Sequence, residues 1–224
     1  MNGNRFEKPL RWSFFSIGLI ILGLGISMTM QVKAFGIGPW DVFHYGLFLK
    51  MGLTVGTWSI LAGLAIVVVH AFIEKRVPQI GTILNMVLIG VFIDFFNWLL
   101  PEPELFLMQV LMFGLGTTVI ALGIGIYVAP EMGAGPRDSL MLMITDATGW
   151  KVSTVRNGIE ITVAVLGFLL GGPVGLGTVF IALFLGTLVG YTLPMARKSL
   201  DLLIRKGEMY ENIYERPLRS NHYD

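Results

Sequence analysis

Long uninterrupted blocks of apolar residues dominate the chain, and short polar stretches separate them. A helix needs about 20 apolar residues to cross a bilayer. Because apolar residues fill whole blocks rather than one helical stripe, the helices they predict need lipid as their solvent. The pattern predicts an all-α membrane protein with six transmembrane helices, at residues 12–32, 57–73, 79–100, 105–128, 155–172 and 176–196.

Two further apolar segments, 39–51 and 136–148, are shorter, with 13 residues each. At this length a helix reaches about 20 Å, less than the roughly 30 Å of the hydrocarbon core. We therefore interpret both segments as re-entrant half-helices, which enter and leave the membrane on the same side. The alternative, in which both segments cross, gives eight spans and a parallel repeat.

The two halves of the chain repeat one another at an offset of 96 to 100 residues. Four ordered matches at one offset are not expected by chance, and each copy contains three crossings and one short segment. An odd number of crossings inverts the second copy relative to the first, so we expect an inverted-topology (3+3) repeat, with residues 12–100 as repeat 1 and 105–196 as repeat 2. The matching stretches are 22–26 with 122–126, 36–41 with 133–138, 52–57 with 149–154, and 80–82 with 176–178.

The basic residues favour the same inversion. With six crossings and both termini in the cytoplasm, every Lys and Arg except Lys33 and Lys50 lies inside, as the positive-inside rule requires. The eight-span alternative places Lys75 and Arg76 outside. Residues 1–11 and 197–224 are then cytoplasmic ends, and we expect the first part of the tail to form a short helix on the inner leaflet.

Composition narrows the function further. Hydrophobic residues make up 54% of the chain and charged residues 14%, against about a quarter charged in soluble domains. There is no cysteine, which excludes disulfides and thiol chemistry, and a net charge of +1 spread over several loops gives no nucleic-acid footprint. No catalytic motif occurs, so we expect no enzyme activity, no metal and no cofactor.

Several stretches resemble one known family. They are Gly-Ile-Gly-Pro-Trp-Asp-Val-Phe-His at 36–44, Gly-Leu-Thr-Val-Gly-Thr-Trp at 52–58, Gly-Ala-Gly-Pro-Arg-Asp at 133–138 and Gly-Gly-Pro-Val-Gly-x-Gly-Thr at 171–178. Together they are similar to the YczE branch of the YczE/YyaS/YitT group of bacterial integral membrane proteins, over about residues 15–195. The resemblance implies a multi-pass protein of the bacterial cytoplasmic (inner) membrane, and it implies no settled substrate.

The Gly-Pro-x-Asp motif opens each short segment. A carboxylate within a membrane is costly, so both aspartates are candidates for binding a solute or carrying a proton. The alternative is structural, because Gly can cap the helix, Pro suits its first position and Asp in the first turn complements the helix dipole. The motif consists of Gly38, Pro39 and Asp41 in the first copy and of Gly135, Pro136 and Asp138 in the second.

Two charged or titratable neighbours extend this set. Arg137 takes the place that Trp40 has in the first copy, where it either forms an anion site with the helix amino end or pairs with Asp138 or a lipid phosphate. His44 lies three residues after Asp41 on the same helical face, and it either relays a proton or packs as a polar side chain.

Three more polar residues lie within the spans. Asp94 and Asn85 belong to the third span, and the repeat partner of Asp94 is Gly190. Glu160 follows Arg156 by four residues, a spacing that predicts an ion pair on one helix face. Asp94 and Glu160 are each candidates for solute or ion binding as well.

Inverted repeats with short helices at matching positions are typical of secondary transporters, with the binding site between the repeats. The leading hypothesis is therefore a small permease for an unidentified solute in the lipid bilayer, with proton coupling and a homodimer left open. The alternatives are the substrate-binding subunit of a multi-component importer and a membrane scaffold or accessory factor without transport activity.

Overall fold

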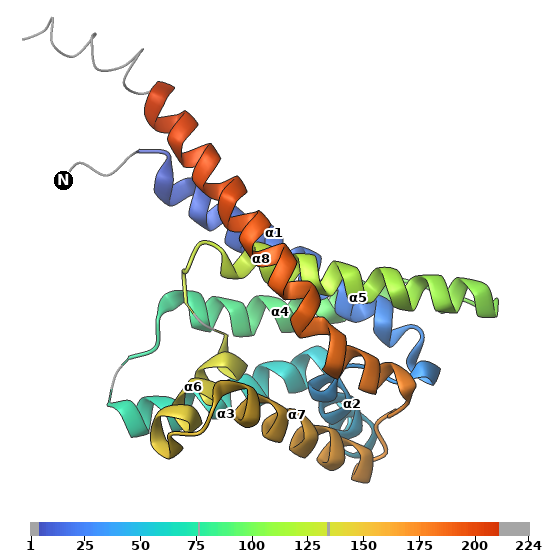
Figure 1. Ribbon diagram of the computed structural model, residues 1–224. Helices are drawn as coiled ribbons and strands as arrows, with labels where there is room; N and C mark the ends of the chain where they lie inside the picture. Colours follow the sequence, from blue (N-terminus) through green and yellow to red (C-terminus); the bar gives the residue numbers. More distant parts are fainter. Residues whose placement is uncertain (1–4, 76, 134, 211–224) are drawn as a thin grey trace, which may run out of the picture.

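The computed structural model describes residues 5–75, 77–133 and 135–210, which form eight α-helices joined by short loops (Figure 1). Six of these helices are long and apolar enough to cross a membrane, as the sequence predicted, and the described ranges contain no strand. In chain order the elements are α1 (Glu7–Met30), the 3-10 turn η1 (Lys33–Phe35), α2 (Pro39–Met51), α3 (Val55–Glu74), α4 (Ile80–Leu99), α5 (Phe106–Val128), α6 (Pro136–Thr148), α7 (Val152–Leu169) and α8 (Leu176–Tyr210).

The two short helices, α2 and α6, begin and end at the residues predicted from the sequence. Each starts with a proline that follows a glycine, Gly38 or Gly135, because the fixed φ of proline suits the first helical turn. Each stops at a glycine with positive φ, 73° at Gly52 and 71° at Gly149, a conformation that other residues rarely adopt. The limits of both helices are therefore determined by local sequence.

At the centre of the molecule, α1 and α5 cross in an antiparallel sense. Gly18 of α1 faces Tyr127 of α5, whereas Gly25 faces Ile120, so residue numbers rise along one helix as they fall along the other. A Cβ atom on Gly123 would lie 2.5 Å from the backbone nitrogen of the residue opposite on α1. Only glycine lets the two backbones approach this closely, as small residues do at helix interfaces in membranes.

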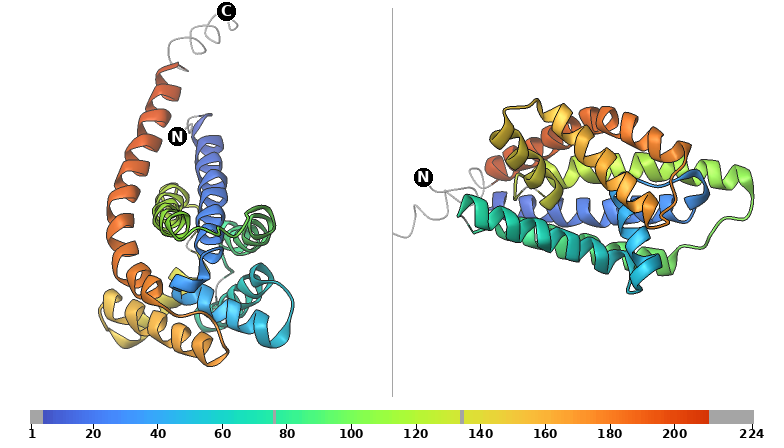
Figure 2. Two further views of the ribbon diagram at one scale, coloured as in Figure 1. Left: turned by 90° about the vertical axis from the view of Figure 1, so that its right-hand side faces the viewer. Right: turned by 90° about the horizontal axis from the view of Figure 1, so that it is seen from below.

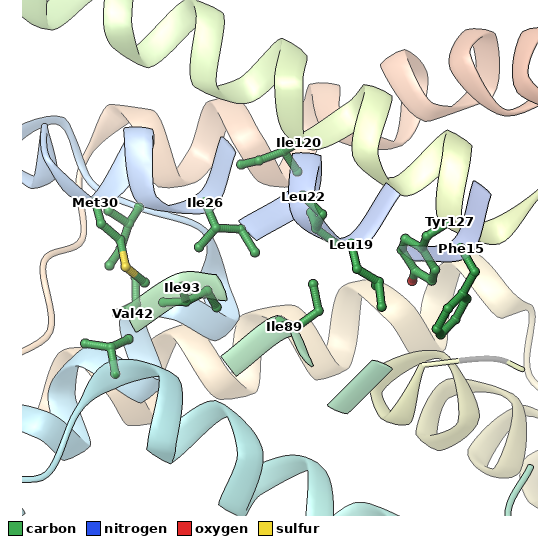
Figure 3. Close-up of a cluster of buried hydrophobic side chains, with 12 residues drawn as sticks. Phe15, Leu19, Leu22, Ile26, Met30, Val42, Ile89, Ile93, Ile120 and Tyr127 are labelled. Carbon is green, nitrogen blue, oxygen red and sulfur yellow. The ribbon is translucent and has the colours of Figure 1, made fainter. Parts of the chain in front are cut away.

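The buried apolar side chains gather along α1, which is the most buried of the six candidate spans (Figure 3). They pack against side chains of α4 and α5, which lie on either side of α1 (Figure 2). The cluster includes Phe15, Leu19, Leu22, Ile26 and Met30 of α1, Ile89 and Ile93 of α4, and Ile120 and Tyr127 of α5.

The other helices pack in matching pairs. In each half the last span lies on the first, because α4 packs on α1 and α8 packs on α5. Each short helix contacts the next span of its own half and also a span of the opposite half, since α2 packs on α7 and α6 packs on α3. These four helices form a second layer below α1, α4 and α5 in Figure 1. The two halves are therefore intertwined rather than side by side.

The halves differ at one contact. In the first half α3 packs closely on α4, where a Cβ atom on Gly56 would lie 2.0 Å from the carbonyl oxygen of Gly90. The corresponding helices of the second half, α7 and α8, make almost no direct contact. A Cβ atom on Gly186, the repeat partner of Gly90, would meet nothing within 4 Å. A gap therefore separates α7 from α8 in the second half, whereas the equivalent helices of the first half, α3 and α4, pack together.

The ends of the bundle differ from the prediction. The last span does not stop at residue 196, and the separate surface helix expected after it is replaced by a continuation of α8 to Tyr210, through Pro194. The continuation buries Ala196 and Leu200, and it approaches the start of α1, where Phe6 lies next to Gly207. Residues 1–4 and 211–224 of the expected cytoplasmic ends, and Arg76 of the loop, lie outside the described residues.

Candidate functional site

A cavity of about 580 Å³ lies between the two halves of the chain, below α1 and α5. Both Gly-Pro-x-Asp turns line it, so the amino ends of α2 and α6 meet at one site although 97 residues separate them in the sequence. The predicted site residues on its wall are Gly38, Pro39, Asp41, His44, Asn85, Gly135, Pro136, Arg137, Asp138 and Glu160.

Arg137 connects the two turns. Its guanidinium Nη2 lies 3.7 Å from Oδ1 of Asp41, and its Cζ atom lies 5.1 Å from the centre of the Trp40 ring. Trp40 and Arg137 hold equivalent positions in the two motifs, so repeat-related side chains contact one another across the cavity. Pairing with Asp138 was one of the alternatives for Arg137. The structure shows an ion pair with the aspartate of the other half instead, because α6 directs Arg137 across the cavity.

Asp138 makes weaker contacts with the protein than Asp41 does. Its Oδ2 accepts a long hydrogen bond of 3.4 Å from the hydroxyl of Tyr127, and no salt bridge to it occurs among the described residues. Asp138 is half-buried, whereas Asp41 is only 5% exposed. The two aspartates are therefore unequal, although their motifs match.

Several polar atoms around the cavity have no hydrogen-bond partner in the part of the chain that the structure describes. They are Oδ1 of Asp41, both ring nitrogens of His44 and Nδ2 of Asn85, and all three side chains are more than nine-tenths buried. The His44 ring lies between the rings of Trp40 and Phe43, at centroid distances of 6.2 and 6.0 Å. Leaving a buried polar group unpaired costs about 1–3 kcal/mol, so these groups point to a bound solute or water.

Glu160 forms the ion pair that its spacing predicted. Its Oε1 accepts a hydrogen bond of 3.1 Å from Nε of Arg156, one turn earlier on α7. Both side chains belong to the cavity wall on the α7 side. The pair is local to one helix, which is why the sequence alone predicted it.

Asp94 lies outside the cavity and holds α4 to the start of α3. Its Oδ1 accepts a hydrogen bond of 2.8 Å from the backbone N–H of Gly56, and its Oδ2 accepts one of 2.5 Å from the hydroxyl of Thr54. Thr54 in turn caps α3 by accepting from the N–H of Thr57. Asp94 thus completes a helix cap. Its role in solute binding stays a prediction.

Among the wall residues that sequence reasoning did not select, two contact predicted site residues. Tyr127 was not singled out, although its repeat partner Ser27 is also polar and fully buried. A polar residue at matching positions near the end of both long spans was the available signal. Trp40 was noted only as the counterpart of Arg137, and its contact with that residue depends on the folding of the two halves together.

Comparison with known proteins identifies the family. A profile of a family of unknown function, DUF6198, matches residues 9–194. The chain belongs to the DUF6198 family. It is 48% identical over 200 residues to the uncharacterized membrane protein YczE of Bacillus subtilis, covering 89% of this chain and 93% of YczE.

Two further relatives support the assignment. An uncharacterized protein of Haemophilus influenzae is 33% identical, covering 81% of this chain and 82% of that protein, and the uncharacterized protein YyaS of Bacillus subtilis is 28% identical, covering 88% and 100%. The resemblance to the YczE and YyaS group is thereby confirmed. No solved structure matches the chain. The DUF6198 relatives establish a membrane protein, and their names state no activity.

Proposed function

We propose that this DUF6198 protein is a small secondary transporter that binds its solute in the cavity between two inverted repeats. The observation that carries the proposal is the meeting of the two Gly-Pro-x-Asp turns at one cavity, where buried nitrogens of His44 and Asn85 lack hydrogen-bond partners among the described residues. In this proposal α2 and α6 are re-entrant helices, and both termini are cytoplasmic. Backbone turns at membrane depth are tolerated when they face such a cavity.

The packing of the helices supports an inverted repeat. Repeat-matched stretches of α1 and α5 meet where the two helices cross in an antiparallel sense, with Gly123 against Leu22. The contacts of α1 with α4 and of α2 with α7 have counterparts in those of α5 with α8 and of α6 with α3. Trp40 and Arg137, which are also matched, contact one another. The proposed twofold axis in the membrane plane would relate all these pairs.

The unequal contacts of the two halves suggest how access alternates. The α3–α4 pair is closed and the α7–α8 pair is open, although the pairs occupy equivalent positions in the two repeats. If the halves exchange these conformations, the open side of the cavity closes and the other side opens. A site between inverted repeats then faces each side of the membrane in turn, with Asp41 or Asp138 available to carry a coupling proton.

Alternating access can be tested without knowledge of the solute, because the chain has no cysteine. A cysteine introduced by Ser59→Cys, on the cavity wall of α3, should react with an impermeant thiol reagent in both right-side-out and inside-out vesicles. The control Glu102→Cys lies in the exposed loop between α4 and α5 and should react from the outside alone. Labelling of Ser59→Cys from one side only would contradict alternating access and favour a fixed binding protein, such as an importer subunit.

Transport itself requires reconstitution. Purified protein in proteoliposomes should take up or release at least one labelled solute from a broad panel, in the presence or absence of a proton gradient. Asp138→Asn should reduce this flux, whereas Asp146→Asn, an exposed aspartate on the same helix and away from the cavity, should not. Flux that is absent across the whole panel, or that survives Asp138→Asn, would count against the proposal.

A further inference from the structure

The charges that line the cavity do not balance. The wall contains three carboxylates, Asp41, Asp138 and Glu160, but only two arginines, Arg137 and Arg156. Arg137 pairs with Asp41 at 3.7 Å and Arg156 pairs with Glu160 at 3.1 Å. Asp138 is the remaining carboxylate. Both arginines attract it only from beyond ion-pair distance, and among the described residues its hydrogen bond is the long contact to a tyrosine hydroxyl. The cavity therefore has room for one positive charge, at Asp138.

The rest of the cavity is suited to an apolar body. Its wall away from the two turns includes many branched aliphatic side chains of α1, α4, α5 and α8, together with the ring of Tyr127 beside Asp138. Its volume of about 580 Å³ falls within the range of 300–1,000 Å³ that is usual for pockets that bind organic molecules. These aliphatic residues include Leu22, Ile26, Ile89, Ile120, Ile124 and Ile181.

The opening of the cavity faces the same way as the gap between α7 and α8. The wall residues of α1, α2 and α4 are mostly buried, whereas Leu183 and Gly186 of α8 and Ser153 and Asn157 of α7 are exposed. Both helices are candidate spans. In the proposed six-span arrangement this opening lies within the membrane and borders on lipid. Its α8 side is apolar and its α7 side is polar, a combination that suits a molecule with one charged and one apolar end.

We propose that the cavity binds a monocationic amphiphile, an organic amine or quaternary cation with a bulky apolar body, which enters from the lipid between α7 and α8. The cationic group lies at Asp138, and the apolar body contacts the aliphatic residues of the cavity wall. The proposal rests on the transporter assignment for its biological meaning, but binding can be measured without transport.

Two ions of the same shape and opposite charge provide the most direct test. Equilibrium dialysis of the purified full-length protein should show saturable binding of tetraphenylphosphonium, with at least tenfold weaker binding of tetraphenylborate. Tetramethylammonium, which has the charge without the apolar body, should also bind at least tenfold more weakly. Equal binding of the two tetraphenyl ions, or tighter binding of the borate, would overturn the proposal, and tighter borate binding would assign an anion site to Arg137.

Three variants identify the carboxylate. Asp138→Asn should weaken tetraphenylphosphonium binding at least tenfold, whereas Asp146→Asn on the same helix should leave it unchanged. Arg137→Gln should strengthen binding, because it frees Asp41 as a second carboxylate. A general loss of structure would weaken binding in both cavity variants, so opposite effects exclude that explanation. Unchanged binding in Asp138→Asn, or weaker binding in Arg137→Gln, would overturn the assignment of the cation to Asp138.

The amine can come from a free compound or from a lipid headgroup, and nanodiscs separate these sources. Protein in phosphatidylglycerol nanodiscs is compared with protein in nanodiscs that also contain phosphatidylethanolamine. Competition by phosphatidylethanolamine assigns the site to a lipid amine, and unchanged tetraphenylphosphonium binding assigns it to a free amphiphile. Cation binding without transport in proteoliposomes would refute the transporter assignment and support the proposed ligand class. Transport of another solute without cation binding would support the transporter assignment and refute the ligand class.

Discussion

Removal of the Asp94 carboxylate tests how the first half is held closed. Two hydrogen bonds end on this side chain, one from the backbone N–H of Gly56 at 2.8 Å and one from the hydroxyl of Thr54 at 2.5 Å. A hydrogen bond to a charged group contributes about 1.5–3 kcal/mol, and the exposure of Thr54 favours the lower figure. Asp94→Ala should therefore reduce the free energy of unfolding by about 3 kcal/mol, because it also leaves the N–H of Gly56 without an acceptor.

Asp94→Asn separates the charge from the hydrogen bonds. The amide oxygen can still accept from Gly56, so the loss should fall to about 1 kcal/mol, mainly from the charge at the helix amino end. The assay is denaturant unfolding of the detergent-solubilised protein, with Asp146→Ala as the control for loss of an exposed aspartate without a described partner. We expect the control variant to be the most stable, Asp94→Asn to be less stable and Asp94→Ala to be the least stable.

The same variants should change access to the cavity. Asp94 joins α4 to the start of α3, so its loss should loosen the close approach of Gly56 to Gly90 and let reagents reach a cysteine at Ser59 faster. If Asp94→Ala is as stable as Asp146→Ala and the cysteine reacts no faster, the carboxylate does not hold the two helices together. The reasoning from the hydrogen bonds would then be refuted.

Three further predictions concern topology, packing and the gap. Impermeant thiol reagents should label Glu102→Cys in intact cells but not Lys75→Cys, and labelling of Lys75→Cys from outside would favour eight spans. Gly123→Ala should destabilise the protein by about 1–3 kcal/mol, as overpacking does, whereas Gly114→Ala on the same helix, with open space around it, should be neutral within about 1 kcal/mol in the same unfolding assay. Gly190→Asp gives α8 the carboxylate that α4 has at the matching position, so it should narrow the gap to α7 and slow labelling of the cavity from that side; unchanged labelling would contradict this.

Local sequence determined most of the secondary structure. Apolar blocks of about 20 residues predict spans because their backbone and side chains must both be compatible with lipid, whatever packs beside them. The limits of α2 and α6 follow from Gly38-Pro39, Gly135-Pro136 and the terminal glycines, which act within one turn. The ion pair between Arg156 and Glu160 is equally local, because four residues bring two side chains to one helix face.

Contacts between distant residues could not be determined in this way. The sequence suggested Asp138 as the partner of its neighbour Arg137, but in the folded protein Arg137 pairs with Asp41, because α6 carries it to the opposite side of the cavity. Asp94 looked like a candidate for solute binding, and its role as a cap for α3 depends on how closely α4 approaches. The continuation of α8 past residue 196 follows from burial of Leu200.

The repeat itself separates the features that the sequence determines from those that the tertiary structure determines. Matching motifs in the two halves predicted matching helices, since similar local sequences have similar conformational preferences. They did not predict that α3 and α4 close while α7 and α8 remain apart, because that difference arises from the packing of whole helices. The sequence thus determined which helices form and where the polar residues stand on them. The tertiary structure decided which polar residues meet, because a charge within a membrane pairs with whichever partner the packed helices bring within reach.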